Sequence, residues 1–362
     1  MDFASVKQWT IPEGDVSKVI DSNENVIWSK DVPDLSSQFY MENTSSTRYV
    51  GLVFWRSSAN PTLQKSTDGI TWTTLCSTDG ENFSIPPNTK YYVRSTGFLN
   101  PTTINVSSPN NTRITSYEDP TVYGNQPALK LGGNIGTIYN TVIPPHTSTS
   151  QDFLFYRLFA YNKEVYDISD LDFNIDSNKF SLNNFATTSE DLGLQYTFAN
   201  MFYNCTNLSV MPTKIAKARG FMKYSASKLT FKIYAPNYYY YRMFEGCTSI
   251  TSTPWICTEV TESYTPTIIS DLCGNYTYSS MFSGCTSLNE IKVSNGRSTS
   301  NFTITIFGNK CAGSFPTKTS TTSNIFYNVG SSGIFKIPSS LRSSNYSSWN
   351  SFVPSGWTVV EV

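Results

Sequence analysis

One short motif returns along this chain at nearly constant intervals. Met-Phe-x-x-Cys-Thr-x-Leu/Ile occupies 201–208, 243–250 and 281–288, and degenerate copies align at 158–165 and 325–329. Successive copies start 43, 42, 38 and 44 residues apart. A repeat of this length is typical of solenoids, in which each unit buries its apolar face only against its neighbours. The chain is therefore expected to stack five units on one core, with the degenerate outer copies as caps.

The apolar positions inside each copy have a fixed spacing. An aromatic residue stands three residues before the Met position at 155, 198, 240 and 278, so apolar side chains fall at i, i+3, i+4 and i+7. This spacing marks one face of two helical turns, and a short apolar stretch follows it. Each repeat is therefore expected to be a short helix that leads into a short strand. The predicted repeat core is Leu158, Phe159, Met201, Phe202, Cys205, Leu208, Met243, Phe244, Cys247, Ile250, Met281, Phe282, Cys285, Leu288, Ile325 and Phe326.

Cysteine usage favours packing over chemistry. The seven cysteines form no Cys-x-x-Cys pair, and His146 is the only histidine, whereas zinc sites usually need closely spaced Cys and His ligands. Asn162 and Val329 replace the repeated cysteine in the outer copies, which suits a small core position and not a ligand or a nucleophile. Buried thiols are the main interpretation, with a disulfide or a metal site as alternatives, and no cofactor is predicted.

The rest of the chain divides by its turn residues and apolar runs. Residues 1–37 predict a β-hairpin and a linker, and a lone hairpin of this size needs a partner surface. Short strands separated by turn signals predict a β-sandwich over 38–145, ahead of the repeat domain at 146–345 and a closing C-terminal strand at 346–362. The expected fold is therefore mainly β with short helices. The apolar residues expected to anchor the hairpin are Ile11, Pro12, Val16, Val19, Val26 and Trp28.

Composition narrows the class of function. The net charge is −1, which argues against a nucleic-acid partner, and the weakly charged, aromatic-rich surface is common in extracellular adhesive proteins. The N-terminus has no basic segment followed by an apolar one, so no signal peptide is expected, and no apolar run is long enough to insert into a membrane. An exterior protein without an export signal fits a virus particle, whose outer proteins are made in the host cytoplasm.

Few residues predict chemistry. Asp167, Asp170 and Asp172 could supply a glycosidase carboxylate pair or bind Ca²⁺, although a solvated strand face is the simpler interpretation. In the run 237–244, Tyr239 and Tyr241 fall off the core positions, and exposed tyrosines bind sugars and protein epitopes well. These two residues are the candidate ligand contacts, with packing as the alternative.

Two groups of known proteins share motifs with this chain. The Met-Phe-x-x-Cys copies resemble BspA-like leucine-rich repeats, which implies a C-terminal solenoid with unusually long inserts. The segments 11–30, 65–75, 90–97 and 337–362, together with the repeats, resemble proteins of gut Bacteroidota phages, crAss-like phages included. This resemblance implies a virion surface protein such as a head fibre, a tail fibre or a decoration protein.

The combined prediction is a non-enzymatic bacteriophage structural protein. Its N-terminus is expected to attach to other virion proteins of the capsid or tail, and its repeats to bind a host-surface glycan or protein. A homo-oligomer, dimer or trimer, is expected for a fibre. The alternatives are a bacterial cell-surface leucine-rich-repeat adhesin and a capsule depolymerase.

Overall fold

The computed structural model describes only part of the chain in detail. Side chains are described over 35–56, 61–97, 99, 112–117, 126–139, 154–173, 196–213, 215, 238–255, 278–293, 325–337 and 353–362, and residues 214 and 256 and four further strands are described by their backbone. Within these residues the chain is mainly β, in several sheets of which none closes on itself. In the same part of the chain, no helix is long and apolar enough to cross a membrane.

Two sheets form the part of the molecule that precedes the repeats, and one of them also includes β11 of the first repeat. The larger has the order β11-β10-β3-β8-β5-β6 and the smaller the order β7-β4-β9. In β8 the side chains of Tyr91, Val93 and Ser95 are buried in alternation with more exposed neighbours, as the two-residue period of a strand requires. Buried side chains of both sheets belong to one core. The strands are β3 (Tyr40–Asn43), β4 (Val50–Trp55), β5 (Leu63–Ser66), β6 (Thr73–Cys76), β7 (Glu81–Ile85), β8 (Thr89–Ser95), β9 (Arg113–Ser116), β10 (Leu129–Asn134) and β11 (Val165–Asp172).

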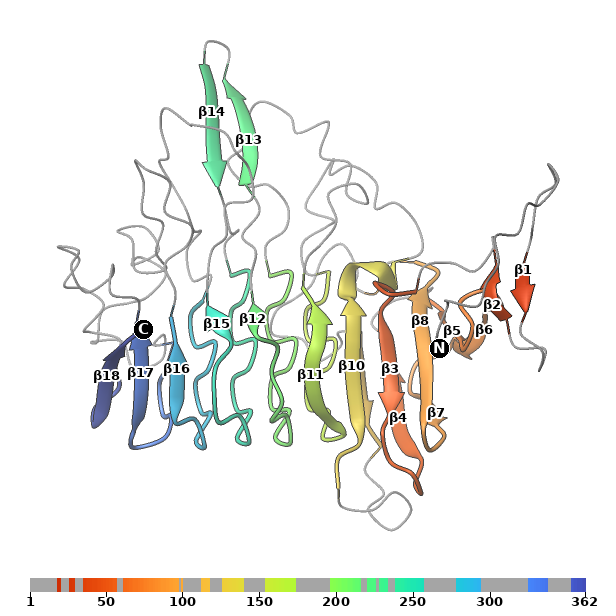
Figure 1. Ribbon diagram of the computed structural model, residues 1–362, viewed down its shortest axis with the longest axis horizontal. Helices are drawn as coiled ribbons and strands as arrows, with labels where there is room; N and C mark the ends of the chain where they lie inside the picture. Colours follow the sequence, from red (N-terminus) through yellow and green to blue (C-terminus); the bar gives the residue numbers. More distant parts are fainter. Residues whose placement is uncertain are drawn as a thin grey trace, which may run out of the picture.

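The larger sheet continues into the repeats. β10 pairs antiparallel with β3 on one side and parallel with β11 on the other, although β11 lies inside the expected repeat domain. Parallel pairing then passes from repeat to repeat, so the strands stand side by side along the molecule (Figure 1). The later pairs are β12 (Lys214–Ile215) with β15 (Trp255–Ile256), β16 (Glu290–Lys292) with β17 (Gly333–Ile337), and β17 with β18 (Trp357–Glu361). The two expected domains therefore contribute strands to one sheet and side chains to one core.

The Met-Phe segments are successive turns, and the prediction of short helices is wrong. We call the described repeat segments rungs 1 to 5, at 154–173, 196–215, 238–256, 278–293 and 325–337. In rung 2 the Met201 amide donates three residues back to Phe198, at 3.2 Å, but the next amide, of Phe202, donates to Met243 of rung 3, at 2.9 Å. This alternation fixes each rung to the next. The helical element of the described residues is a 3₁₀ turn, η2 (Ile135–Ile138), after β10.

Backbone geometry explains the absence of helix in these segments. Every fourth residue has a positive φ, for example Asn200 at 55° and Asn204 at 57°, whereas an α-helix needs φ near −63° throughout. A positive φ at the third residue of a turn is what a type II turn requires. The positions are Arg157, Tyr161, Tyr196, Asn200, Asn204, Tyr238, Arg242, Gly246, Ser280, Gly284 and Asn328.

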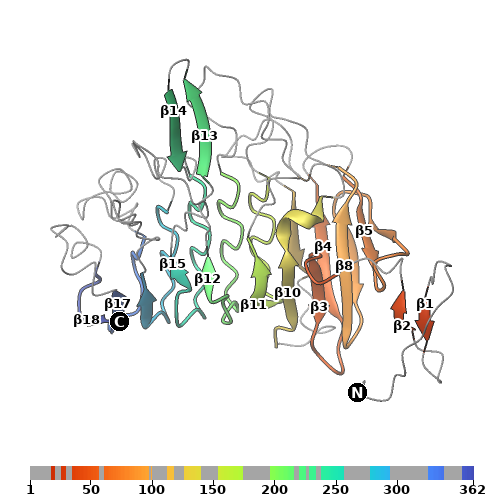
Figure 2. The same cartoon turned by 45° about the horizontal axis from the view of Figure 1, so that its top comes forward.

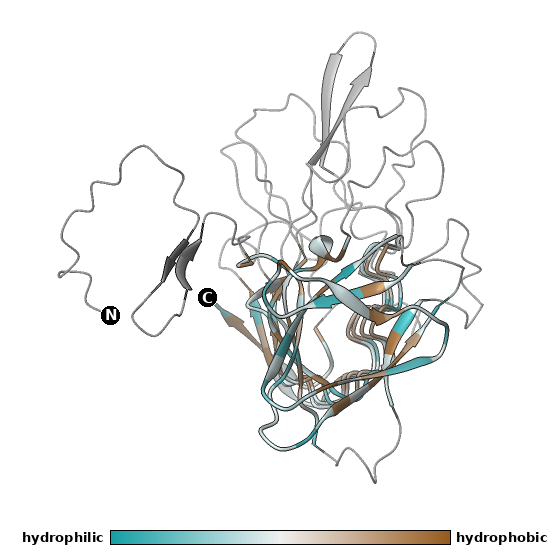
Figure 3. Cartoon of the chain, turned by 90° about the vertical axis from the view of Figure 1, so that its right-hand side faces the viewer, coloured by the Kyte–Doolittle hydropathy of each residue, from teal (hydrophilic) through white to brown (hydrophobic). Residues whose placement is uncertain are grey.

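Equivalent side chains of successive rungs stack on one another. Phe202 lies between Phe159 and Phe244, with ring centroids 5.6 Å away on both sides and interplanar angles of 11° and 4°. A second row runs from Phe155 through Phe198 and Tyr240 to Tyr278. The structure places all sixteen predicted repeat-core residues in the interior. Figure 3 looks along the row of rungs, which overlie one another in that view.

Two hairpins stand apart from this row. β1 (Lys18–Ile20) pairs antiparallel with β2 (Val26–Ser29), and the pair lies at the end of the molecule opposite β18 (Figure 1). Val19, Val26 and Trp28 are on these strands, whereas Ile11, Pro12 and Val16 lie outside the described residues. The second hairpin joins β13 (Gly220–Ser225) to β14 (Lys228–Ile233) and projects away from the strands of the rungs (Figure 2).

Candidate functional site

The repeated cysteines act as hydrogen-bond donors between rungs. The Sγ atoms of Cys205, Cys247 and Cys285 donate to the main-chain oxygen of the Phe one rung earlier, at 3.0, 3.0 and 3.2 Å. Burial raises the pKa of the Cys205 thiol to about 12 and raises the pKa values of the other two as well. A protonated, buried thiol is neither a nucleophile nor a metal ligand, so this row is part of the packing.

Asn162 takes the place of the cysteine in rung 1. Its Nδ2 atom donates to the Ile114 oxygen at 3.0 Å, so strand β9 supplies the acceptor that an earlier rung would provide. Its Oδ1 atom accepts from the amides of Glu164 and Val165 at 2.9 and 3.3 Å, where the rung enters β11. The Asn162 side chain, which stands where later rungs have cysteine, therefore joins the first rung to the preceding sheets.

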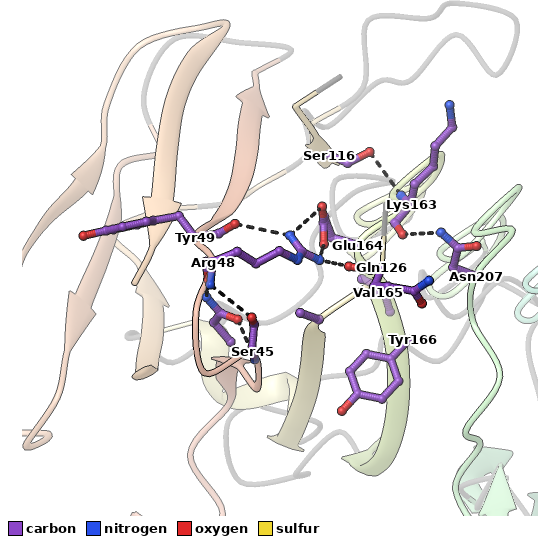
Figure 4. Close-up of polar contacts among 12 residues, drawn as sticks. Ser45, Arg48, Tyr49, Ser116, Gln126, Lys163, Glu164, Val165, Tyr166 and Asn207 are labelled. Atoms are coloured by element: carbon purple, nitrogen blue, oxygen red, sulfur yellow. Dashed lines mark hydrogen bonds and ion pairs between the residues drawn. The ribbon is translucent and has the colours of Figure 1, made fainter. Parts of the chain in front are cut away.

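A second junction, also made by residues directly before β11, is drawn in Figure 4. Arg48 donates to both carboxylate oxygens of Glu164, at 3.2 and 2.7 Å, and to the main-chain oxygens of Tyr49 and Gln126. Burial raises the pKa of the Glu164 carboxyl, and the Arg48 guanidinium opposes this rise. Figure 4 also shows Lys163, whose amide donates to Ser116 Oγ at 3.1 Å. These contacts fix rung 1 to the preceding sheets.

The three aspartates of β11 are engaged with neighbouring strands. Asp170 lies 2.7 Å from the Lys130 ammonium and accepts from the Tyr40 hydroxyl at 2.9 Å, and the hydrogen bond from Lys130 lowers its pKa. Asp167 lies 3.7 Å from the same ammonium, and Asp172 accepts from an asparagine of β10. The part of the chain that the structure describes holds no group of three His, Cys, Asp or Glu residues placed to bind a metal ion. These carboxylates join β11 to β10 and β3.

The turn segments carry a surface rich in tyrosine and arginine. Tyr196 stacks on Tyr238 at 4.5 Å and 5°, and Tyr161 meets Tyr203 edge-on at 5.3 Å. The Arg242 guanidinium lies over two tyrosine rings, at 5.8 and 5.5 Å, and pairs with a carboxylate of its own rung at 2.6 Å. We call this the tyrosine–arginine surface, formed by Arg157, Tyr161, Tyr196, Tyr203, Tyr238, Tyr241, Arg242 and Glu245.

Backbone strain is concentrated on this surface. The other positive-φ positions of the turns hold Asn, Gly or Ser. On the tyrosine–arginine surface, however, the same positions hold bulky residues, and for a bulky residue a positive φ is an outlier that costs about 1 kcal/mol or more. The five residues are Arg157, Tyr161, Tyr196, Tyr238 and Arg242, with φ between 53° and 64°. Strain that recurs on one surface is typical of functional sites.

The structure separates the two tyrosines that the sequence selects. Tyr241 belongs to the tyrosine–arginine surface, where it contacts Tyr238 at 5.5 Å. Tyr239 instead packs against the core, edge-on to Phe198 at 5.2 Å and to Tyr240 at 4.7 Å. The other members of the surface were missed because they lie at the variable positions of the Met-Phe-x-x-Cys motif or in the few residues before it. For Arg157, Tyr161 and Arg242 the signal is an Arg or Tyr directly before the Met-Phe pair or the Cys position.

Comparison of the chain with protein-family models, with curated proteins and with solved structures finds no significant match.

Proposed function

We propose that this protein is a non-enzymatic structural protein of a bacteriophage virion, a head or tail fibre or decoration protein that binds a host-surface glycan or protein. The N-terminal hairpin attaches it to capsid or tail proteins, and a β-sandwich connects this anchor to a BspA-like leucine-rich-repeat solenoid with long inserts. The protein is displayed at the virion surface as a homo-oligomer, a dimer or trimer. Weak sites presented in many copies then gain avidity through effective concentration.

The observation that carries the binding role is the strain on the tyrosine–arginine surface. Asn or Gly would relieve it at each of the five positions, as they do elsewhere in the same turns. Tyr and Arg are the side chains most enriched in binding hot spots, because they bring large rigid area together with polar groups. A surface that keeps these residues at a cost in stability is best explained by a ligand.

The rungs support a role in display. Each rung is held to the next by main-chain hydrogen bonds, stacked rings and thiol hydrogen bonds, so the tyrosine–arginine surface has a fixed shape. A rigid surface binds with little loss of conformational entropy. The hairpin of β1 and β2 lies at the end of the molecule opposite β18, which leaves the row of rungs free to extend from an anchored end.

Electron microscopy tests the location. Antibodies against the full-length protein are expected to label heads or tails of purified phage particles from gut Bacteroidota. Labelling of uninfected bacterial cells instead would contradict the proposal and favour the bacterial adhesin.

In infected cells, a variant that lacks residues 1–30 is expected to be absent from particles, and unchanged incorporation would contradict the anchor. Incubation with purified capsular polysaccharide is expected to leave its chain length unchanged, since shortening would favour the depolymerase.

A further inference from the structure

Two arginines lie together where the preceding sheets meet rung 1. Arg113 on β9 is the register partner of Trp55 on β4, and the following amide, of Ile114, donates to the Leu158 oxygen of rung 1. Trp55, Arg113 and Arg157 thus stand on three neighbouring passes of the chain. Hydrogen-bonded passes are ~4.8 Å apart, so the row from Trp55 to Arg157 spans about 10 Å.

This arginine pair carries an excess of positive charge. Burial and the neighbouring Arg157 lower the pKa of Arg113, and Tyr161 and Asp79 oppose this effect. Within the described residues no carboxylate forms an ion pair with Arg157, and its buried Nε atom makes no hydrogen bond. Arg242, in contrast, has Glu245 at 2.6 Å. Two adjacent guanidinium groups repel each other less when an anion lies between them, and guanidinium binds carboxylate and sulfate groups in a bidentate manner.

Exposed aromatic rings flank the arginine pair. Trp55 is 38% exposed and Tyr161 is 42% exposed, the former next to Arg113 and the latter four residues after Arg157. Contacts with neighbouring side chains fix the position of both rings. The Trp55 indole donates to Thr115 Oγ1 at 3.0 Å and lies 5.5 Å from the Arg113 guanidinium, and Tyr161 rests on Tyr203. Immobilised, half-exposed rings beside a cation pair offer stacking faces for the apolar C–H faces of sugars.

We propose that Trp55, Arg113, Arg157 and Tyr161 bind an acidic polysaccharide, with an anionic substituent between the two guanidinium groups and sugar rings on the two aromatic faces. The inference rests on the proposed function, because it names the class of ligand that the adhesive surface takes. A glycan fits better than a nucleic acid, since the chain as a whole has a net charge of −1 and lacks the basic excess that phosphate backbones attract.

The test uses the full-length protein and soluble polymers in a calorimetric titration. Polygalacturonate carries carboxylates, dextran sulfate carries sulfates, and dextran is the neutral reference. Arg157→Gln is expected to weaken binding of the anionic polymer about 10-fold, as the loss of one charge-assisted contact implies. Tyr161→Leu, which keeps the same backbone requirement, is expected to weaken it by a smaller factor. Preference for polygalacturonate or for dextran sulfate identifies the anion, and either supports the proposal.

Arg94→Gln is the matched control. The Arg94 guanidinium lies over the Trp72 ring, at 4.1 Å, on another part of the sheets. The substitution therefore removes an arginine that contacts an aromatic ring and leaves the proposed site unchanged. Equal losses in Arg94→Gln and Arg157→Gln would overturn the proposal, as would equal affinity for dextran or for poly-glutamate. All variants must keep the wild-type circular dichroism spectrum. If particles are labelled but no anionic polymer binds, only this inference fails. If polymer binding persists without particle labelling, the virion location fails instead.

Discussion

The turn geometry of the rungs predicts that substitution of alanine for either of two equivalent glycines destabilises the protein. If these segments were helices, the same substitutions would stabilise it. Gly246 and Gly284 precede the cysteine in rungs 3 and 4, with φ of 75° and 74°. A methyl group added at Gly246 would overlap the side-chain oxygen of Asn204 in rung 2, whereas at Gly284 it would meet its nearest neighbour at an ordinary 3.5 Å. Gly284→Ala therefore measures backbone strain alone, and Gly246→Ala measures strain together with the clash.

The magnitudes follow from these two contributions. An alanine at positive φ costs roughly 1–2 kcal/mol, of which a reduced entropy of the unfolded chain returns roughly half. Gly284→Ala should therefore destabilise the protein by about 1 kcal/mol. At Gly246 the Asn204 side chain must also leave its rotamer, which adds about 1 kcal/mol. In the helix that the apolar spacing predicts, either substitution would instead stabilise by about 1 kcal/mol.

Urea unfolding followed by circular dichroism gives the free energies of unfolding. The double variant Asn204→Gly with Gly246→Ala removes the overlap, and Gly suits the φ of 57° at position 204. The two substitutions should therefore couple favourably, by about 1 kcal/mol. The reasoning is refuted if Gly246→Ala costs no more than Gly284→Ala, if Asn204→Gly brings no rescue, or if both alanines stabilise the protein.

Three further predictions concern the core, the pH dependence and the junction. Cys247→Ala should lower the free energy of unfolding by about 1–2 kcal/mol and leave ligand binding unchanged, as urea titration and calorimetry would measure. Hydrogen bonds from Lys336 and Ser252 lower the pKa of Glu290 from 4.5 to about 2, so its stabilisation is complete above the unfolded pKa and is lost as the pH falls from about 5 to 2. Glu290→Gln should flatten the stability profile in that window by about 1 kcal/mol, after allowance for solvent screening. Arg48→Met should cost about 2–3 kcal/mol because it leaves Glu164 buried without its cation, and adding Glu164→Gln should recover part of this.

The core of the repeats could be predicted from the sequence because it depends only on spacing. Met201, Phe202 and Cys205 recur at fixed offsets, and any periodic backbone that stacks equivalent residues must place them together. Their burial followed from repetition without knowledge of the local conformation. The replacement of cysteine by Asn162 likewise indicated a structural position, although the acceptor on β9 could not be foreseen.

The conformation of the turns was mispredicted because two backbones share one apolar spacing. Residues at i, i+3, i+4 and i+7 face one side of a helix, but they also face one side of turns that repeat every four residues. The deciding signal was present in the Asn or Gly before each repeated cysteine, at 204, 246 and 284, and before Val329, at 328, since these residues tolerate positive φ best. The strain at Arg157 and Tyr161 could be recognised only once this register was known.

The shared sheet was hidden for a different reason. β10 and β11 are separated by the segment 135–164, and no local pattern states that a strand of one region pairs with a strand of the next. Such a contact depends on tertiary geometry. The arginine pair of Arg113 and Arg157 has the same origin, because it forms only where β9 meets rung 1.

The thiol row gives the molecule a direction of growth. Each cysteine donates to the Phe oxygen of the preceding rung, and in rungs 2 and 3 the Phe oxygen of the same rung accepts from the cysteine of the next rung. Each of these interior rungs therefore provides the same kind of acceptor to the next rung as it receives from the one before. Duplication or loss of one whole rung would therefore leave all remaining joints intact. Related chains could change their length in steps of ~4.8 Å, by gene duplication within the array and with both ends unchanged.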